Sequence, residues 1–222
     1  MSSPVLRRVV VTCGPSYEPI DEVRRITNQS TGKLGIRLSN RLAAAGFQVT
    51  CLKGVGALHP EPLFPEVELV RFTTNDHLLE RMTALAEREQ VAAVFHAAAL
   101  CDFKVRTVQD EAGVATGTAK LSSRTGELTL ILQPATKIIG HLRPLFPDAR
   151  IVGWKYELEG SREEVIEKGA RQLRENGSDL CVLNGRAYGS GFGALTPDGT
   201  LTQIAGYDPL CDWLCDWLRA AT

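Results

Sequence analysis

Short apolar runs alternate with segments of helical periodicity along this chain, and this alternation is the feature that most constrains its fold. The run at residues 9–11 is continuously apolar and the run at 91–99 is almost wholly apolar, which is typical of strands buried on both faces of a parallel sheet. Between such runs, apolar residues recur at helical spacing, as in residues 36–45. The alternation predicts a single α/β domain over residues 1–222, with a doubly wound, mostly parallel sheet of Rossmann-like topology.

The remaining elements follow the same alternation. Further strands are predicted at residues 47–52, 67–72, 128–132, 151–154, 180–183 and 200–204. Further helices are predicted at residues 75–89, 137–145, 161–175 and 210–218, the third with a capping box at Ser161 and Glu164. In the last helix, Leu210, Leu214 and Leu218 form one stripe that packs on the sheet. Residues 112–125 lack a period and form either a plain loop or a mobile flap, and their length favours the flap.

The charge balance argues against a nucleic-acid-binding protein. The 222 residues include 25 Lys and Arg against 26 Asp and Glu, a formal net charge of −1, whereas nucleic-acid binders usually carry a basic excess. No apolar run approaches the roughly 18 residues of a membrane span, and the start MSSPVLRR does not resemble a signal peptide. The six cysteines are scattered without C-x-x-C spacing, so we expect reduced core thiols in a cytoplasmic protein and no protein-bound metal.

Neither of the two common phosphate-binding motifs is present. A dinucleotide fold would show G-x-G-x-x-G after the first strand, but the second and third glycines are missing from the segment that starts at Gly14, GPSYEP. Gly32 and Lys33 begin like a phosphate loop, yet Leu34 follows where that motif has Ser or Thr. An anionic ligand therefore has to be bound by another device.

Two polar segments offer such a device. The loop from Asn28 to Lys33 precedes a helix whose first N–H groups and dipole favour an anion, although it could equally be an ordinary capped surface helix. Small residues at 97–99 end a strand and would let a flat ligand approach, with Asp102 accepting hydrogen bonds from its ribose or base. The alternative for that segment is close packing against a helix, with Asp102 capping a turn. Lys120 reaches a phosphate only if its loop closes.

These segments carry a resemblance to phosphopantothenate–cysteine ligase. The similarity runs over roughly residues 9–192, most of the chain. The similar blocks are GPSYEPID at 14–21, VRRITNQSTGKLG at 23–35, AAALCDF at 97–103, KL at 120–121, GWKYE at 153–157 and DLCVLN at 179–184. The first block alone is specific, and the blocks occur in the family's order. The residues of the third and fifth blocks are similar to those of the family's stand-alone, eukaryote-like members. We therefore expect a ligase without a decarboxylase half.

The resemblance implies a two-step reaction in coenzyme A biosynthesis. The carboxylate of 4′-phosphopantothenate attacks the α-phosphate of CTP or ATP, which gives an acyl-nucleotidylate and pyrophosphate. The amino group of cysteine then displaces the nucleotide to form an amide. Mg²⁺ and lysines are implied because pyrophosphate carries a high negative charge. The family's second subunit completes the phosphopantothenate site, which implies a homodimer.

The resemblance also implies roles for particular residues. Asn28 handles the acyl-nucleotidylate and Lys120 acts from the flap on the triphosphate, as the catalytic pair. Substrate is bound by Arg24, Asn28, Ser30, Gly32 and Lys33. The nucleotide is bound by Gly14, Ser16, Ala97, Ala98, Ala99, Asp102, Lys137 and Trp154.

The sequence departs from the family at several of these places. Pro15 and Ser16 replace Gly-Thr, Lys137 stands where many members have an acid, and Gly185 replaces Asp. Leu173 lies near the place of a family lysine, for which Lys168 or Arg171 could substitute. Because of these departures, the sequence does not determine whether the nucleotide is CTP or ATP. They also keep a non-catalytic nucleotide-binding relative as an alternative, while an NAD(P)-dependent short-chain-type reductase is disfavoured by the absence of a Tyr-x-x-x-Lys pair.

Overall fold

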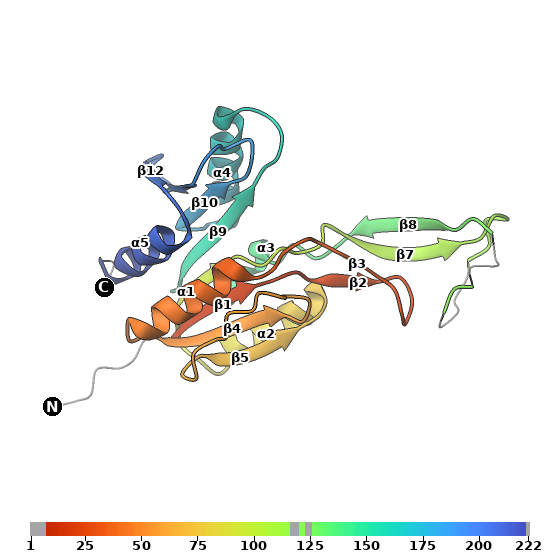
Figure 1. The fold of residues 1–222 in the computed structure, drawn as a ribbon, viewed down its shortest axis with the longest axis horizontal. Coiled ribbons are helices and arrows are strands. Elements are labelled where there is room, and N and C mark those ends of the chain that lie inside the picture. Colours follow the sequence, from red (N-terminus) through yellow and green to blue (C-terminus); the bar gives the residue numbers. More distant parts are fainter. Residues whose placement is uncertain (1–7, 116–119, 123–125, 221–222) are drawn as a thin grey trace.

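Eight strands form the central sheet, in the order β12-β11-β10-β9-β6-β1-β4-β5. The computed structural model describes residues 8–115, 120–122 and 126–220 (Figure 1). The sheet strands are β1 (Arg8–Cys13), β4 (Gln48–Gly54), β5 (Glu68–Phe72), β6 (Val91–His96), β9 (Arg150–Tyr156), β10 (Leu180–Asn184), β11 (Phe192–Leu195) and β12 (Leu201–Ile204). The six strands that are neighbours in the sheet order β10-β9-β6-β1-β4-β5 pair in parallel. Strands β11 and β12 add antiparallel pairs at one edge. The mostly parallel sheet is confirmed.

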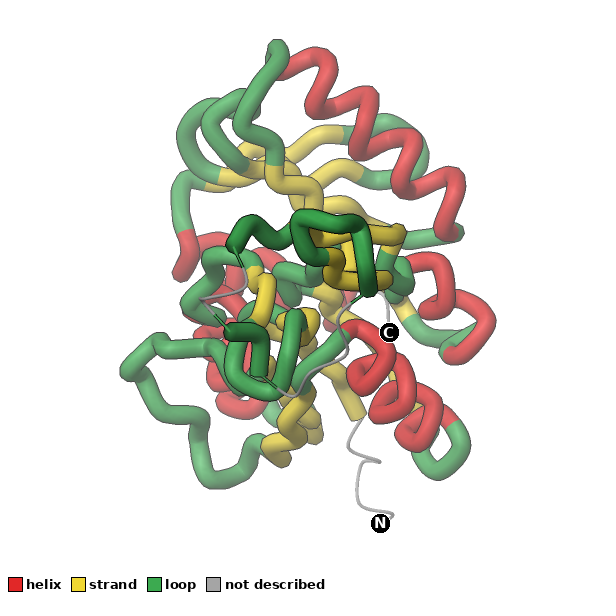
Figure 2. Tube along the Cα trace, turned by 90° about the vertical axis from the view of Figure 1, so that its right-hand side faces the viewer, coloured by secondary structure: helices red, strands yellow, loops and turns green. Residues whose placement is uncertain are grey.

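Helices cover both faces of this sheet (Figure 2). They are α1 (Lys33–Ala44), α2 (Asn75–Ala86), α3 (Ile139–Leu145), α4 (Arg162–Asn176) and α5 (Tyr207–Ala220). Because side chains alternate across a strand, Val9 and Val11 of β1 pack in one core with α1 and α5, whereas Val10 packs in another with α2 and α3. The doubly wound class is therefore confirmed.

One helix terminus and one helix face bear out the local sequence signals, and a second terminus does not. The hydroxyl of Ser161 accepts from the N–H of Glu164 and the Glu164 side chain accepts from the N–H of Ser161, which completes the capping box of α4. The stripe at Leu210, Leu214 and Leu218 is buried, as predicted. By contrast, α1 begins three residues before the predicted start, after Gly32, and it has no side-chain cap.

Two hairpins stand outside the central sheet, and neither was predicted as a hairpin. The first, β2 (Tyr17–Pro19) and β3 (Arg25–Thr27), is inserted between β1 and α1. The second, β7 (Phe103–Gln109) and β8 (Thr129–Pro134), forms an arm that projects from the body of the molecule (Figure 1). Only the predicted strand at 128–132 anticipated part of this arm. The first insertion explains why no dinucleotide fingerprint follows β1, since the connection to α1 is a hairpin and not a tight turn.

The thiols are buried and the described chain lacks a spanning helix. All six cysteines are buried and free. Within residues 8–115, 120–122 and 126–220, no helix combines the length and the apolar character needed to cross a membrane. The same residues contain no group of three or more His, Cys, Asp or Glu side chains that could hold a metal ion.

Candidate active site

The segments that follow β1 and β6 lie side by side at the carboxyl edge of the sheet. The N–H of Ala99 donates to the carbonyl of Gly14 at 2.9 Å, and the N–H of Ser16 donates to the carbonyl of Ala99 at 3.2 Å. The buried hydroxyl of Ser16 accepts from the N–H of Cys101 at 2.8 Å. These hydrogen bonds hold the predicted residues Gly14, Ser16 and Ala99 together. Strand β6 itself ends at His96 and not at residue 99, where the sequence predicted its end.

Gly14 and Gly32 serve close packing in this arrangement. Both have φ near +77°, and a Cβ added to either would lie 2.6 Å (Gly14) or 3.0 Å (Gly32) from the Cβ of Ala57. The two glycines thus let the turn and the start of α1 pack on the loop after β4. In a similar way Gly35 lies against Cys13, since its added Cβ would come 2.2 Å from that residue's Cβ.

A cavity of about 210 Å³ opens at the ends of β6 and β9, and we name it the Asp102 cavity. It brings together four residues predicted to bind the nucleotide, namely Ala98, Asp102, Lys137 and Trp154. The side chain of Trp154 packs against the core on the α1 and α5 side, and its buried Nε1 has no hydrogen-bond partner.

A second cavity, of about 430 Å³, is lined by residues of the β2–β3 hairpin, the loop before α1 and the loop after β4, and we name it the Asn28 cavity. Asn28 and Ser30 line it, as does Arg25, whose guanidinium lies 4.8 Å from the centre of the Tyr17 ring. The amide Nδ2 of Asn28 donates to the carbonyl of Leu100 at 2.7 Å, and Leu100 lines the Asp102 cavity. The Asn28 side chain therefore links the wall of one cavity to the wall of the other.

The start of α1 contributes less than the sequence suggested. The N–H of Gly32 lies 3.4 Å from the hydroxyl of Ser30, at the edge of the Asn28 cavity. The side chain of Lys33, however, turns towards α5, with Nζ 4.9 Å from the centre of the Tyr207 ring. Lys33 lines neither the Asn28 cavity nor the Asp102 cavity.

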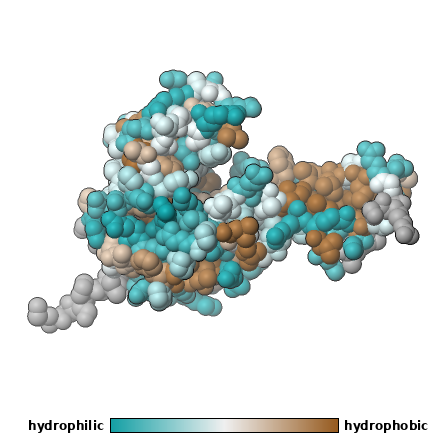
Figure 3. Space-filling model, viewed as in Figure 1, coloured by the Kyte–Doolittle hydropathy of each residue, from teal (hydrophilic) through white to brown (hydrophobic). Residues whose placement is uncertain are grey.

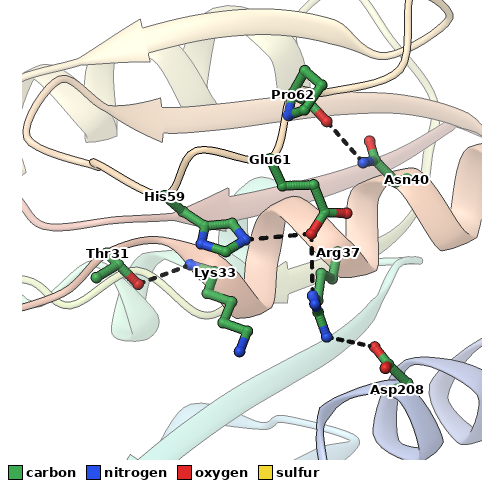
Figure 4. A network of polar contacts seen from close by, with 8 residues as sticks. All are labelled: Thr31, Lys33, Arg37, Asn40, His59, Glu61, Pro62 and Asp208. Carbon is green, nitrogen blue, oxygen red and sulfur yellow. Dashed lines mark hydrogen bonds and ion pairs between the residues drawn. The ribbon is translucent and has the colours of Figure 1, made fainter.

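Further along α1, the charged side chains are already paired. Arg37 bridges Glu61 at 3.1 Å and Asp208 at 2.8 Å, and His59 also contacts Glu61 (Figure 4). This network ties α1 to α5 and to the loop before β5. It borders a cavity of about 360 Å³, but its cations are neutralised by carboxylates, so it does not offer a free anion site.

Arg24 and Lys120 lie away from both cavities of their own chain. Arg24, at the tip of the β2–β3 hairpin, donates to the carboxylate of Asp21 at 2.6 Å and to the carbonyl of Leu121 at 2.6 Å. The N–H of Leu121 donates to the same carboxylate, and the Arg24 guanidinium holds the pKa of Asp21 well below its ordinary range. Lys120, which precedes Leu121 in the chain, is exposed. Much of the flap predicted at 112–125 (residues 116–119 and 123–125) lies outside the described residues.

Three residues that the sequence did not single out also line the Asp102 cavity: Asn75, His96 and Gln172. Burial lowers the pKa of His96 to about 4, so this imidazole is neutral near pH 7. Leu173 is buried in the core, and Gln172 beside it faces the cavity. The helical spacing of Val165, Gly169 and Leu173 could have shown that Leu173 points inward.

The comparisons with known proteins show the family of this chain. The model of the DNA/pantothenate metabolism flavoprotein C-terminal domain matches residues 5–209. The chain belongs to this family. Over 186 residues it is 33% identical to the coenzyme A biosynthesis bifunctional protein CoaBC of Thermococcus kodakarensis, a match that covers 83% of this chain and 43% of that protein. The chain thus spans less than half the length of that relative.

Solved structures show the same fold. A DNA/pantothenate metabolism flavoprotein from Streptococcus pneumoniae superposes with a TM-score of 0.84 at 24% identity, covering 97% of this chain and 100% of that one. A Cab2 mutant in complex with phosphopantothenate-cysteine superposes with a TM-score of 0.72 at 18% identity, covering 97% and 88%.

One departure from the family pattern has a structural reason, and the position of Lys168 is also defined. Gly185 has φ of +110°, and an added Cβ would lie 2.2 Å from the carbonyl oxygen of Glu157, so an aspartate would not fit there. Lys168 is ion-paired with Glu157 at 2.7 Å. Neither residue reaches the Asp102 cavity, whose wall is instead supplied with a cation by Lys155 next to Glu157.

Proposed function

We propose that this chain is a phosphopantothenate–cysteine ligase of coenzyme A biosynthesis. It activates 4′-phosphopantothenate with CTP or ATP to an acyl-nucleotidylate and then couples the acyl group to cysteine. The observation that carries the proposal is the hydrogen bond from Asn28 to Leu100, which connects the walls of the two cavities. A relative that takes part in coenzyme A biosynthesis and a neighbour that holds phosphopantothenate-cysteine support it.

The two cavities divide the reactants between them. The nucleotide occupies the Asp102 cavity, where Asp102 accepts hydrogen bonds from the ribose and Lys137 attracts the phosphates. Phosphopantothenate occupies the Asn28 cavity, where Arg25 offers a cation beside Asn28 and Ser30, the two predicted substrate residues that line it. The carboxylate and the α-phosphate then meet beside Asn28.

The Asn28 amide has a second N–H that is available as a hydrogen-bond donor in the second step. One N–H of its amide donates to the carbonyl of Leu100, and the other N–H remains for the oxyanion that forms when cysteine attacks the acyl group. A donor already fixed by one hydrogen bond needs little reorganisation when that charge develops. The mixed anhydride also supplies a good leaving group, which a free carboxylate lacks.

Magnesium fits the site as an ion that arrives with the nucleotide. Asp102 is the single carboxylate of the Asp102 cavity wall in the described part of the chain. Mg²⁺ typically uses one or two carboxylates together with substrate phosphates, and there it would neutralise the pyrophosphate charge. The cytoplasm, where buried thiols stay reduced, is the compartment that we propose for the reaction.

We infer that the working form is a homodimer. The β7–β8 arm exposes apolar side chains (Figure 3), with Phe103 53% and Leu132 44% exposed. A two-stranded ribbon with apolar residues in water is marginal alone and is stabilised when a second copy covers it. Arg24 and Lys120, which reach neither cavity of their own chain, are then assigned to the site of the second copy.

The test is a pyrophosphate-release assay. Purified protein is incubated with phosphopantothenate, cysteine, Mg²⁺ and either CTP or ATP, and the coupled product is identified by mass spectrometry. We expect pyrophosphate only when a nucleotide and phosphopantothenate are both present. No pyrophosphate with any nucleotide would contradict the ligase, and it would favour the non-catalytic relative or the reductase.

A further inference from the structure

The Asp102 cavity is sorted by charge. Of the charged residues in its wall, Asp102 and Lys137 are exposed and Lys155 is ion-paired with Glu157 at 3.2 Å, whereas the uncharged His96 is only 8% exposed. His96 of β6 and Gly153 of β9 are register partners, and Gln172 of α4 lies over Gly153, whose added Cβ would come 2.7 Å from Gln172 Nε2. The absent side chain at position 153 thus lets Gln172 pack close to the strand beside His96, so neutral polar groups line the inner end of the cavity.

The charge of a nucleotide is distributed in the same way. Its triphosphate is strongly charged, whereas its base is flat and neutral. Because burying a charge without a partner costs far more than burying a neutral group that is hydrogen-bonded, the base belongs at the inner end and the phosphates at the exposed mouth. The neutral state of His96, produced by burial, suits a base and does not suit a phosphate.

Thr12 fixes which nitrogen of His96 carries the proton. The Thr12 hydroxyl lies 2.9 Å from Nδ1 of His96 and accepts from the N–H of Ala98 at 3.2 Å. Thr12 is fully buried, so its single hydroxyl proton needs an acceptor, and Nδ1 is the acceptor within reach. A neutral imidazole that accepts at Nδ1 is protonated at Nε2. Nε2–H is therefore the donor left for the cavity.

Asn75 supplies an independent sign of a ligand. It is 1% exposed, and its Nδ2 donates to the carbonyls of Cys101 at 2.8 Å and Thr136 at 2.9 Å. Because carbonyls only accept, these contacts fix the amide orientation and leave Oδ1 as the buried acceptor without a partner. Buried polar groups are nearly always hydrogen-bonded, so this acceptor in the cavity wall calls for a donor.

We propose that His96 is a specificity-determining residue whose Nε2–H donates to an acceptor atom of the nucleobase, while Oδ1 of Asn75 accepts from a donor group of the same nucleotide. The inference rests on the proposed function for placing a nucleotide in the Asp102 cavity. It adds a reader of the base to a site in which the other named residues hold the ribose, the phosphates and the acyl group.

Binding measurements on the full chain test it. Calorimetry measures the affinity of CTP, ATP and pyrophosphate, each with Mg²⁺, for the wild type, His96→Leu, His96→Gln and the control His141→Leu, which changes an exposed histidine of α3. We expect His96→Leu to weaken the preferred nucleotide about tenfold, the effect of one lost hydrogen bond, and to leave pyrophosphate binding unchanged. His96→Gln, which keeps a donor, should recover most of the affinity, and His141→Leu should change nothing.

A nitrogen-15 spectrum of the wild type gives a second readout. It should show the Nε2–H tautomer of His96, and Thr12→Val should weaken that preference. Unchanged nucleotide affinity in His96→Leu, an equal loss of nucleotide and pyrophosphate, or the Nδ1–H tautomer would each overturn the inference.

These measurements separate the two proposals. Nucleotide binding that depends on His96 without pyrophosphate release in the ligase assay would refute the ligase alone. Ligation with a nucleotide KM that His96→Leu does not alter would refute the role of His96 alone. If no nucleotide binds at all, both are wrong.

Discussion

The neutral, buried state of His96 makes the stability of this protein sensitive to mild acid. Burial lowers its pKa from 6.5 to about 4 in the folded chain, whereas the unfolded chain keeps the ordinary value. The unfolded state therefore binds more protons between these two values, so stability falls as the pH falls through that window and is fully present above it. The full pKa difference corresponds to about 3 kcal/mol, of which about 2 kcal/mol should be lost between about pH 7 and pH 5.

The assay is urea unfolding at those two pH values, for the wild type, His96→Leu and His141→Leu. Hydrogen bonds from Thr136 and Lys104 lower the pKa of Asp76, and Lys168 and Lys155 lower that of Glu157 against its burial. Protonation of these carboxylates in acid also destabilises the fold, but it does so equally in all three proteins. The wild type and His141→Leu should lose about 2 kcal/mol more than His96→Leu over this range. An equal loss in all three would refute the neutral, buried imidazole, and with it the donor proposed for the base.

Four substitutions test other parts of the structure. Asn28→Ala should still release pyrophosphate but slow the transfer to cysteine by about 10²-fold, followed by quenched-flow detection of the acyl-nucleotidylate; failure to form that intermediate would contradict the role of Asn28. Lys120→Ala should slow pyrophosphate release itself, because the triphosphate loses a counter-charge, and a full first-step rate would remove this lysine from the mechanism. Gly35→Ala should destabilise the fold by about 1–3 kcal/mol in denaturant unfolding, because the new methyl group overlaps Cys13, and unchanged stability would show that α1 can move away. Leu132→Lys should convert a dimer to a monomer in sedimentation equilibrium, because it charges the apolar arm; a dimer of undiminished affinity would place the interface elsewhere.

Much of the fold was predictable because its signals are local. A strand buried on both faces is mostly apolar, so the apolar runs around Val10 and Val94 could be recognised as strands from the sequence. The capping box at Ser161 is likewise a pattern of neighbours along the chain. The two hairpins escaped prediction because β2 and β3 have three residues each, and the arm exposes apolar residues that would otherwise mark a buried strand.

The sequence by itself determined the alternation of strand and helix, the family resemblance and the short segments at Asn28 and Asp102, because each is encoded by residues close together in the chain. The tertiary structure alone decided which of those side chains share a cavity. Asn75, His96 and Gln172 come from α2, β6 and α4 and meet only because the strand register sets His96 beside Gly153. Lys33 and Arg24 turned away from the cavities because Tyr207 and Asp21 lie within their reach. Proximity across a sheet depends on register and packing, and neither is written in a local run of residues.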